Sequence, residues 1–511
     1  MKQLSLFTFS CIVSIGTLLL YNLPFFSYAA THSQESMAGK VWLLASLTVI
    51  MLALHFMLTY LLVYLLRMVG RVLLAVLFVI NATAVYFIIT YGVIIDATTI
   101  ENVFNTRYSE ASGFFCWGLW LSVLLLGVLP AVYCVLQPVV RGSLKRLAVS
   151  CGSSLAVIVV VALLNIGQTL WISQHDTELG GLLQPWSYVV NTCRVVSSHF
   201  DSQAEEILLP DGHIADHSKT VVVLVIGESA RKANFQLYGY SRATNPLLSV
   251  RSDLHVYPAT SCATYTTAGT KAILEPMDSG DLYELLPNYA FRTGVDVSWR
   301  TSNWGEPPIH IDEYLTDGDL AKLYPDVDSA YDGILLAGLR QRIVNSASDK
   351  VLIVLHTSTS HGPNYADKCP PRFAVFQPVA TSVEQGQSNV GLLVNAYDNT
   401  IVYTDYLLDS LITMLGSLPD WHSALLFISD HGESLGENSI FMHGLPMNLA
   451  PRVQYEVPFL VWTSDAFRSY KSARQLPEVL DQHFVFHSVL NLLSIQSPAY
   501  NSNYDIFQKP Q

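Results

Sequence analysis

Long apolar stretches fill the first third of the chain, and shorter ones recur in the remainder. Five apolar runs lie near residues 4–26, 41–66, 72–95, 114–137 and 147–172. Each exceeds the roughly 20 residues that a helix needs to cross the hydrocarbon core of a bilayer. The pattern predicts five transmembrane helices followed by a large soluble part.

Basic residues between the apolar runs indicate how the helices are oriented. Arg67 and Arg71 separate the second run from the third, and Arg141, Lys145 and Arg146 separate the fourth from the fifth. The positive-inside rule places these residues in the cytoplasm, which leaves the large carboxyl-terminal part outside. If the first run is instead a signal peptide cleaved near residue 29, four spans remain and the soluble part is still extracytoplasmic.

The soluble part has the pattern of an α/β domain. Short continuous apolar runs at 221–226, 351–355 and 425–428, the first of them mostly β-branched, are typical of buried parallel strands. The stretch 395–416 has helical spacing of apolar residues. Strands that alternate with helices predict a mostly parallel sheet with helices on both faces.

These patterns divide the chain into three parts. We predict a transmembrane domain at 1–175, a linker with interfacial helices at 176–218 and a catalytic α/β domain at 219–511. Residues 182–200 fit either a helix on the membrane surface or a helix packed on the soluble domain. The Pro-Asp-Gly turn at 210–212 marks the second boundary.

Charge divides in the same place. Residues 1–175 hold eight Lys and Arg against four Asp and Glu, so with −13 overall the remainder carries −17. An acidic soluble domain argues against a nucleic-acid partner, because such partners require clustered Lys and Arg. Only Cys262 and Cys369 of the seven cysteines fall in the soluble domain, and the sequence leaves open whether they pair.

Potential metal ligands follow the predicted strands. Glu228 follows the first strand, His361 the second, and Asp430 and His431 the third. Each alone could be a cap or a solvated loop residue. Because the carboxyl ends of parallel strands meet at one edge of a sheet, we expect these side chains to converge. Carboxylate and imidazole are ligands that Zn²⁺ prefers, so the coincidence predicts a zinc site.

Several motifs surround these residues: GESAR followed by NFQLYGYSRATNP, then SCATYTT, TSHGPNY, NAYDNTIVYTD, and SDHGESLGE followed by MHGLP. Together they resemble the membrane-bound phosphoethanolamine transferases of Gram-negative bacteria, a family that modifies lipid A and related glycans and includes colistin-resistance transferases. The resemblance covers almost the whole chain. It implies a sulfatase/alkaline-phosphatase-like fold for the soluble domain, an inner-membrane location and a periplasmic catalytic domain.

The resemblance also implies roles for individual residues. Four match the family's zinc ligands: Glu228, Thr266, Asp430 and His431. Three match its catalytic residues: Thr266 as nucleophile, with His361 and His443 near the transferred phosphate. Thr264 and Thr267 compete with Thr266 for the role of nucleophile. Four match positions that bind substrate: Asn102, Thr106, Glu110 and Glu433. The first three of these lie at i, i+4 and i+8, which places them on one helix face.

A threonine hydroxyl is a poor nucleophile at neutral pH, and a bound Zn²⁺ would activate it. The resemblance implies phosphatidylethanolamine as the donor, a phosphoethanolamine-threonine intermediate, and lipid A or another lipopolysaccharide or surface glycan as the acceptor. A phosphoglycerol transferase of the lipoteichoic-acid-synthase type is the main alternative, because it shares the spans, the fold and the threonine. A non-catalytic membrane-anchored binding protein is the other alternative, and it would not need the metal ligands.

Overall fold

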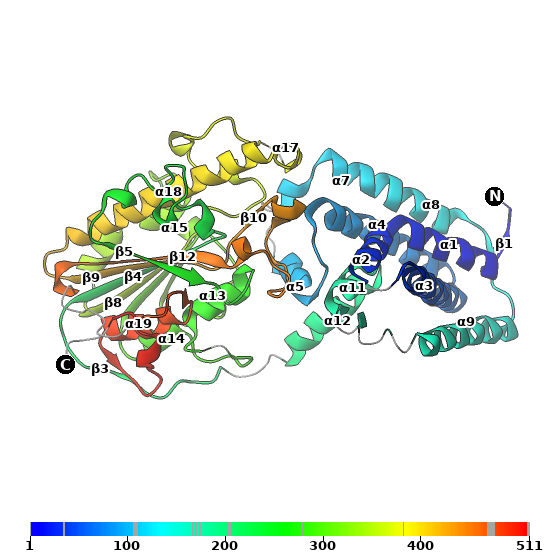
Figure 1. Ribbon diagram of the computed structural model, residues 1–511. Coiled ribbons are helices and arrows are strands. Elements are labelled where there is room, and N and C mark those ends of the chain that lie inside the picture. Colours follow the sequence, from blue (N-terminus) through cyan, green and yellow to red (C-terminus); the bar gives the residue numbers. More distant parts are fainter. Residues whose placement is uncertain are drawn as a thin grey trace. The chain divides into compact units, whose positions relative to one another are not determined.

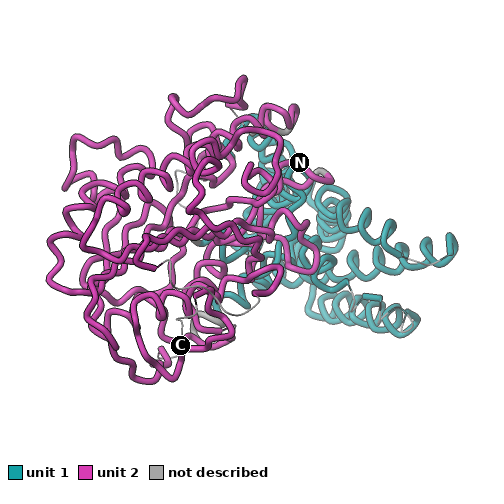
Figure 2. The backbone as a smooth tube through the Cα atoms, turned by 60° about the vertical axis from the view of Figure 1, so that its left-hand side comes forward, with its two compact units in different colours: residues 1–106, 114–201 teal, residues 107–113, 202–511 magenta. Residues whose placement is uncertain are grey.

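The computed structural model describes residues 2–33, 36–105, 111–165, 168, 171–172, 175–201, 206–277, 279–381, 383–467 and 476–507. The chain forms two compact units, one of residues 1–106 with 114–201 and one of residues 107–113 with 202–511 (Figure 2). The first unit is helical, and the second is built on a β-sheet (Figure 1).

The first unit contains the predicted membrane helices. Its helices are α1 (Leu6–Tyr21), α2 (Leu23–His32), α3 (Met37–Leu66), α4 (Met68–Tyr91), α5 (Ala97–Asn105), α7 (Trp117–Ser122), α8 (Leu129–Leu136), α9 (Leu144–Leu164), α11 (Asp176–Leu182) and α12 (Trp186–Asp201). A π-helical segment, Val123–Val128, joins α7 to α8, and the short strands β1 (Leu4–Ser5) and β2 (Val139–Val140) pair in parallel. In the described part of the chain, α3, α4, the stretch from α7 to α8, and α9 are long and apolar enough to span a membrane. The bent pair α1–α2 makes a fifth span if it is counted as one.

The first apolar run is bent rather than continuous. Helices α1 and α2 meet at 60° around Asn22, and Pro24 lies in the first turn of α2, where its missing N–H costs no helical hydrogen bond. The Asn22 side chain fixes this bend, because its Nδ2 donates to the Gln184 carbonyl at 3.1 Å and its Oδ1 accepts from the Gln184 N–H at 2.9 Å.

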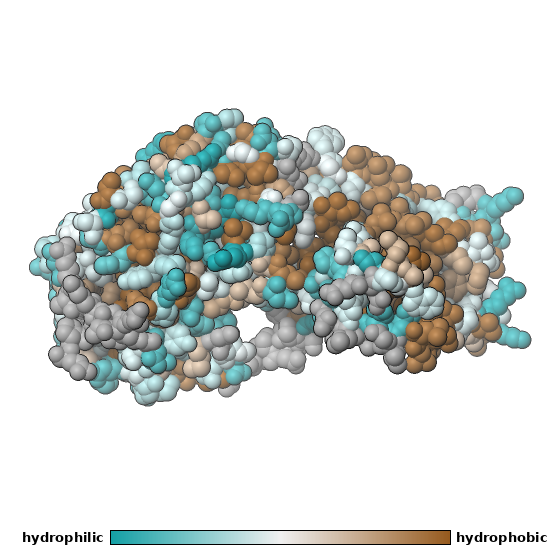
Figure 3. Space-filling view, in the orientation of Figure 1, coloured by the Kyte–Doolittle hydropathy of each residue, from teal (hydrophilic) through white to brown (hydrophobic). Residues whose placement is uncertain are grey.

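The outer surface of the first unit is strongly apolar. Leu65, Leu125 and Val160 are among many large apolar side chains that are exposed, and Figure 3 shows the broad hydrophobic area to which such residues give rise. Aromatic residues such as Phe9 and Tyr60 pack inside the unit instead. Lipid tails are as apolar as leucine, so exposed leucine and valine fit a surface that contacts lipid.

The second unit is built on an eight-stranded sheet in the order β13-β5-β12-β9-β4-β8-β6-β7. These strands are β4 (Thr220–Gly227), β5 (Leu254–Thr260), β6 (Asp296–Thr301), β7 (Glu313–Thr316), β8 (Lys350–His356), β9 (His422–Ser429), β12 (Glu456–Thr463) and β13 (Leu480–Asp481). Strands β9, β4, β8, β6 and β7 are parallel, and β12 is antiparallel to both of its neighbours. The three strands predicted from the sequence are therefore β4, β8 and β9, at the centre of the sheet.

Helices cover both faces of this sheet, as predicted. Val222 and Leu224 of β4 belong to one core, whereas Val221 and Val223 belong to the other, because successive side chains of a strand point to opposite faces. The first core includes residues of α13 (Thr266–Leu274), α14 (Leu286–Arg292) and α19 (Phe484–Leu492). The second includes residues of α15 (Asp317–Leu323), α16 (Leu339–Val344) and α18 (Val390–Gly416). The remaining short elements are β3 (His213–Ile214), β10 (Ser434–Leu435), β11 (Phe441–Met442), β14 (Ile495–Gln496) and α17 (Val383–Ser388).

Cys262 and Cys369, whose pairing the sequence left open, are both free thiols. Cys369 is buried and donates to the Asn399 carbonyl at 3.3 Å. Cys262 lies elsewhere, with its Sγ 3.8 Å from Nδ1 of His483.

Candidate active site

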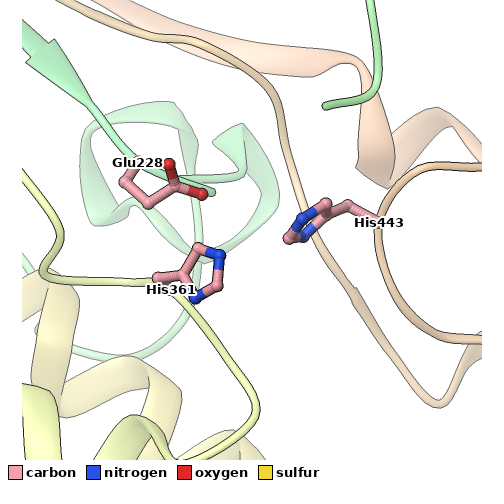
Figure 4. Close-up of side chains that lie close together, drawn as sticks. All are labelled: Glu228, His361 and His443. Atoms are coloured by element: carbon pink, nitrogen blue, oxygen red, sulfur yellow. The ribbon is translucent and has the colours of Figure 1, made fainter. Parts of the chain in front are cut away.

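The polar residues that follow the central strands meet at one edge of the sheet. Glu228 directly follows β4, Asp430 and His431 directly follow β9, and His361 lies in the loop after β8. His443 directly follows β11. Glu228, His361 and His443 point toward a common space (Figure 4). The parallel arrangement of β4, β8 and β9 thus brings together residues that are far apart in the sequence.

The four predicted zinc ligands lie close to one another. Oγ1 of Thr266 lies 3.2 Å from Oε2 of Glu228 and 3.3 Å from Nε2 of His431. Nε2 of His431 lies 3.4 Å from Oε1 of Glu228 and 3.5 Å from Oδ2 of Asp430. Tetrahedral zinc with bonds of about 2.0–2.2 Å separates its ligand atoms by about 3.3–3.6 Å. The four observed distances, which involve both oxygens of Glu228, are close to this range.

Asp430 and His431 are also oriented as ligands. Nδ1 of His431 lies 2.8 Å from the Gly432 carbonyl, which assigns the proton to Nδ1 and leaves the Nε2 lone pair for a metal. Oδ1 of Asp430 accepts from the N–H groups of Ser229 and His431. Oδ2 of Asp430 is buried and accepts no hydrogen bond from the described residues. A cation would satisfy this oxygen.

The electrostatics of the buried carboxylates favour a bound cation. Burial alone would raise the pKa of Glu228, but His361, His431 and His443 lower it well below its usual range. Burial and the neighbouring Glu228 raise the pKa of Asp430 well above its usual range. Burial and the nearby His443 lower the pKa of His431 to about 4, so this imidazole is neutral at pH 7. A divalent cation would allow both carboxylates to ionise and would bind the neutral imidazole.

His361 and His443 also lie beside Glu228, and the His443 ring is 4.2 Å from the His431 ring. One ligand atom from each of Glu228, His361 and His443 lies within 4.8 Å of the others, and the rings of His361 and His443 are 5.6 Å apart. Nδ1 of His361 lies 2.7 Å from the Gly362 carbonyl, and Nδ1 of His443 lies 2.9 Å from Oε2 of Glu433. Both contacts use Nδ1, which in His361 leaves Nε2 for a substrate or for a second cation. Burial raises the pKa of Glu433 to about 8.

Two residues that the sequence did not single out hold Glu228 in place. Nδ2 of Asn303 donates to Oε2 of Glu228 at 2.7 Å, and Oγ of Ser229 donates to Oε1 at 2.6 Å. Asn303 lies two residues beyond β6, the next strand along the sheet from β8, and also contacts His356 at 3.2 Å. Its position just after the run Val295–Thr301 was the available clue, because that run is itself a strand that ends at the same edge.

Thr266 is the first residue of α13, and its hydroxyl lies beside Glu228 and His431. The positive end of the helix dipole therefore faces the site. The approach of this helix to β9 is very close, because a Cβ at Gly269 would lie 2.3 Å from the Asp430 carbonyl oxygen. A side chain at this position would require α13 or Asp430 to shift, and so would change the distance between Thr266 and Asp430.

The competing threonines have other surroundings. The Thr264 hydroxyl donates to the Leu445 carbonyl at 2.6 Å. Oγ1 of Thr267 is buried and makes no hydrogen bond within the described part of the chain. Thr266 is therefore the threonine that these contacts favour as nucleophile.

The predicted lipid-binding residues belong to the first unit or to an undescribed segment. Asn102 lies on α5 and is partly buried. Thr106 and Glu110 lie outside the described residues.

Comparison with known proteins gives consistent matches along the chain. Residues 220–495 match the sulfatase family, and residues 50–200 match the family described as phosphoethanolamine transferase EptA/EptB. The chain is 35% identical to phosphoethanolamine transferase EptA of Helicobacter pylori, over 99% of this chain and 98% of that protein. It is 29% identical to phosphoethanolamine transferase EptA of Salmonella typhimurium, over 96% of this chain and 90% of that protein. The solved integral membrane protein lipooligosaccharide phosphoethanolamine transferase A (EptA) from Neisseria meningitidis has a TM-score of 0.90 and 26% identity, covering 100% of both chains.

Proposed function

Because the chain belongs to the membrane-bound phosphoethanolamine transferases of the sulfatase superfamily, we propose that it transfers phosphoethanolamine from phosphatidylethanolamine, with zinc, to lipid A or another lipopolysaccharide or surface glycan. The protein is an inner-membrane transferase with its catalytic domain in the periplasm. The contact of Oγ1 of Thr266 with both Glu228 and His431 carries the proposed mechanism. The relative from Neisseria meningitidis is named for a lipooligosaccharide, which supports an acceptor of this class.

The zinc ligands in this proposal are Glu228, Thr266, Asp430 and His431. When bound, zinc would lower the pKa of the threonine hydroxyl and so make it a stronger nucleophile at neutral pH. Asn303 and Ser229 orient the Glu228 carboxylate through their hydrogen bonds. Such supporting contacts typically affect metal affinity strongly.

In the first half of the reaction, Oγ1 of Thr266 attacks the phosphorus of the donor phosphodiester. The bond from Oγ1 to phosphorus forms while the bond from phosphorus to the glycerol oxygen breaks. One of His361 and His443 accepts the threonine proton, and the other donates a proton to the departing diacylglycerol. The amino-terminal end of α13 stabilises the negative charge on the phosphoryl oxygens. The products are diacylglycerol and a phosphoethanolamine-threonine adduct.

In the second half, an acceptor oxygen attacks the same phosphorus and the bond to Oγ1 of Thr266 breaks. The imidazole that protonated the diacylglycerol accepts the proton of the acceptor, and the imidazole that took the threonine proton returns it to Thr266, which restores the enzyme. Glu433 orients His443 through its contact with Nδ1. In this proposal the donor head group contacts Asn102, Thr106 and Glu110, and Glu110 pairs with its ammonium group.

The test uses the full-length protein, zinc and a fluorescent phosphatidylethanolamine without acceptor. We expect release of diacylglycerol and a phosphoethanolamine adduct on Thr266, detected by peptide mass spectrometry. Thr266→Ala and zinc chelation should abolish both products. The neighbouring Thr267→Ala is the matched control and should retain the adduct.

The same assay separates this proposal from its main alternative. If the zinc-loaded protein cleaves phosphatidylglycerol and leaves phosphatidylethanolamine intact, it is a phosphoglycerol transferase. If it forms an adduct at Thr264 or Thr267, the assignment of the nucleophile is wrong. Addition of lipid A, or of lipopolysaccharide lacking its lipid A phosphates, then identifies the acceptor by the transfer of phosphoethanolamine from the adduct, followed by mass spectrometry.

A further inference from the structure

A large cavity opens in the first unit where α1 and α9 begin. Its volume is about 590 Å³, which is within the usual size range of small-molecule binding sites. Its lining includes Phe7 and Tyr60 and the basic residues Arg141, Lys145 and Arg146. The parallel pairing of β1 with β2 holds the beginning of the chain beside residue 140 and so forms one wall. This cavity is separate from the residues that carry the proposed reaction.

The basic residues of this cavity have no acidic residue near them in the sequence. The chain contains no Asp or Glu at all in residues 2–34, 36–95 or 111–175, which include every residue that lines the cavity. All three basic side chains are largely exposed. Basic residues at this membrane face help to set the topology of the chain. That role alone does not require them to gather around a cavity.

Two helix amino termini add to the positive potential. Ser5 caps α1 by accepting from the Thr8 N–H, and Ser143 caps α9 by accepting from the Arg146 N–H. Each helix therefore directs the positive end of its dipole to this region. Lys145 and Arg146 lie in the first turn of α9, where the dipole disfavours a cation. An anion bound in the cavity would offset the repulsion among the basic side chains and the unfavourable interaction of Lys145 and Arg146 with the helix dipole.

The remaining lining residues suit a lipid better than a free anion. The Arg141 guanidinium lies 4.1 Å from the ring centre of Tyr64, a cation–π contact that holds it in one orientation. Phe7 and Val149 are 55% and 61% exposed, although both are large apolar residues. The cavity therefore combines a cationic part with an apolar margin on a unit whose outer surface contacts lipid.

We propose that this cavity binds the head group of an anionic phospholipid of the cytoplasmic leaflet, such as phosphatidylglycerol or cardiolipin. The lipid phosphate contacts Arg141, Lys145 and Arg146, and the acyl chains lie along Phe7 and Val149. The positive-inside rule puts these basic residues on the cytoplasmic side, opposite the proposed donor site. This inference does not depend on the proposed transfer reaction.

The test is a lipid titration of the full-length protein in detergent, followed by native mass spectrometry. The lipids are phosphatidylglycerol, cardiolipin, phosphatidylethanolamine and phosphatidylcholine, and inorganic phosphate is titrated separately. We expect the two anionic lipids to bind most tightly. A triple variant, Arg141→Gln with Lys145→Gln and Arg146→Gln, should bind phosphatidylglycerol about 100-fold more weakly, because each basic residue near an anionic lipid contributes about fivefold.

Two further variants control for charge and topology. Arg67→Gln removes a cation from the same membrane face outside the cavity lining and should leave binding unchanged. The double variant Arg141→Lys with Arg146→Lys keeps the charge and should retain most of the binding. If the triple variant does not fold, the salt dependence of lipid binding by the wild type tests the proposal instead. Raising salt from about 50 to about 500 mM should weaken binding of phosphatidylglycerol but not of phosphatidylcholine.

Three results would overturn the proposal: equal binding of anionic and zwitterionic lipids, unchanged binding by the folded triple variant, or binding of phosphatidylglycerol that does not respond to salt. Displacement of phosphatidylglycerol by inorganic phosphate at equal concentration would also overturn it and would indicate a site for a free anion.

Discussion

The proposed active site and the cavity lined by Arg141, Lys145 and Arg146 both gather charged groups, but the charges are balanced in different ways. In the active site Glu228, Asp430 and His431 are at most 1% exposed, and each lies within 3.5 Å of another of the three. In the cavity, Arg141 and Arg146 are exposed and no carboxylate is nearby in the sequence. Buried charges depend on fixed partners, so the loss of one is severe. Exposed cations act through their summed field, so each loss is modest.

The largest effect should come from Asp430→Asn. The amide cannot supply the negative charge that the proposed zinc site requires, so zinc should be lost and transfer should fall by at least about 1000-fold. Zinc content by elemental mass spectrometry and diacylglycerol release measure the two effects. Asp420→Asn, an exposed position in the same domain, is the control. A variant that keeps one zinc per chain would contradict the assigned ligand set.

A smaller effect is expected for Asn303→Ala, which leaves every proposed ligand in place. Glu228 would lose the 2.7 Å hydrogen bond to its Oε2. Zinc affinity, measured by competition with a chelator, should then fall about 10- to 100-fold. Asn345→Ala, at an exposed position, should leave it unchanged. Equal affinities for wild type and Asn303→Ala would show that the burial of Glu228 alone fixes this ligand.

Asp405 shows how a carboxylate behaves when it is buried away from the proposed zinc site. It accepts the N–H groups of Leu247 and Leu248 at 2.8 and 3.0 Å, yet burial raises its pKa to about 6. The folded state therefore binds this proton more tightly than the unfolded state does. Its contribution to stability is complete below about pH 4 and is lost as the pH rises through about 6, for a total of up to about 3 kcal/mol.

Thermal unfolding of the full chain between about pH 4 and about pH 7 measures this contribution. Asp405→Asn should flatten the pH dependence in that range. Asp420→Asn is the control, because Asp420 is exposed in the same domain. The same pH profile in wild type and Asp405→Asn would exclude Asp405 as the source.

The smallest effects should come from single substitutions in the cavity. Arg141→Gln, Lys145→Gln and Arg146→Gln should each weaken binding of phosphatidylglycerol about fivefold, and the losses should multiply. In the active site, Asn303→Ala and Ser229→Ala should instead be non-additive, because both residues contact the same carboxylate. If one single substitution abolished all lipid binding, the cavity would depend on one fixed contact, as the buried site does, and not on the summed charge of its basic residues.

The sequence predicted the central part of the soluble domain well. Strands β4, β8 and β9 contain continuous apolar runs, because strands buried on both faces need apolar side chains at every position. Their parallel order follows from the alternation with helices, and it is this order that brings Glu228 and Asp430 together. Choosing Thr266 over Thr264 and Thr267 required the resemblance to a family, since three nearby threonines have the same chemistry.

Features that depend on contacts between distant residues were not predictable in the same way. The bend at Asn22 needs a partner at Gln184, and a single asparagine in an apolar run does not indicate one. Asn303 is likewise one polar residue after a strand, and its role follows only from the position of β6 in the sheet. The sequence placed Arg141 in the cytoplasm, but the cavity depends on the pairing of β1 with β2.

Gly269 has no reactive side chain, yet the position of Thr266 beside Glu228 and His431 depends on it. A methyl group there would overlap the Asp430 carbonyl and push the first turn of α13 away from β9. A homologue with alanine at this position would need α13 or Asp430 to shift, and Thr266 would then lie differently against Glu228 and His431. The residue at this position is therefore informative about the geometry of the proposed site in relatives that keep all of its polar residues.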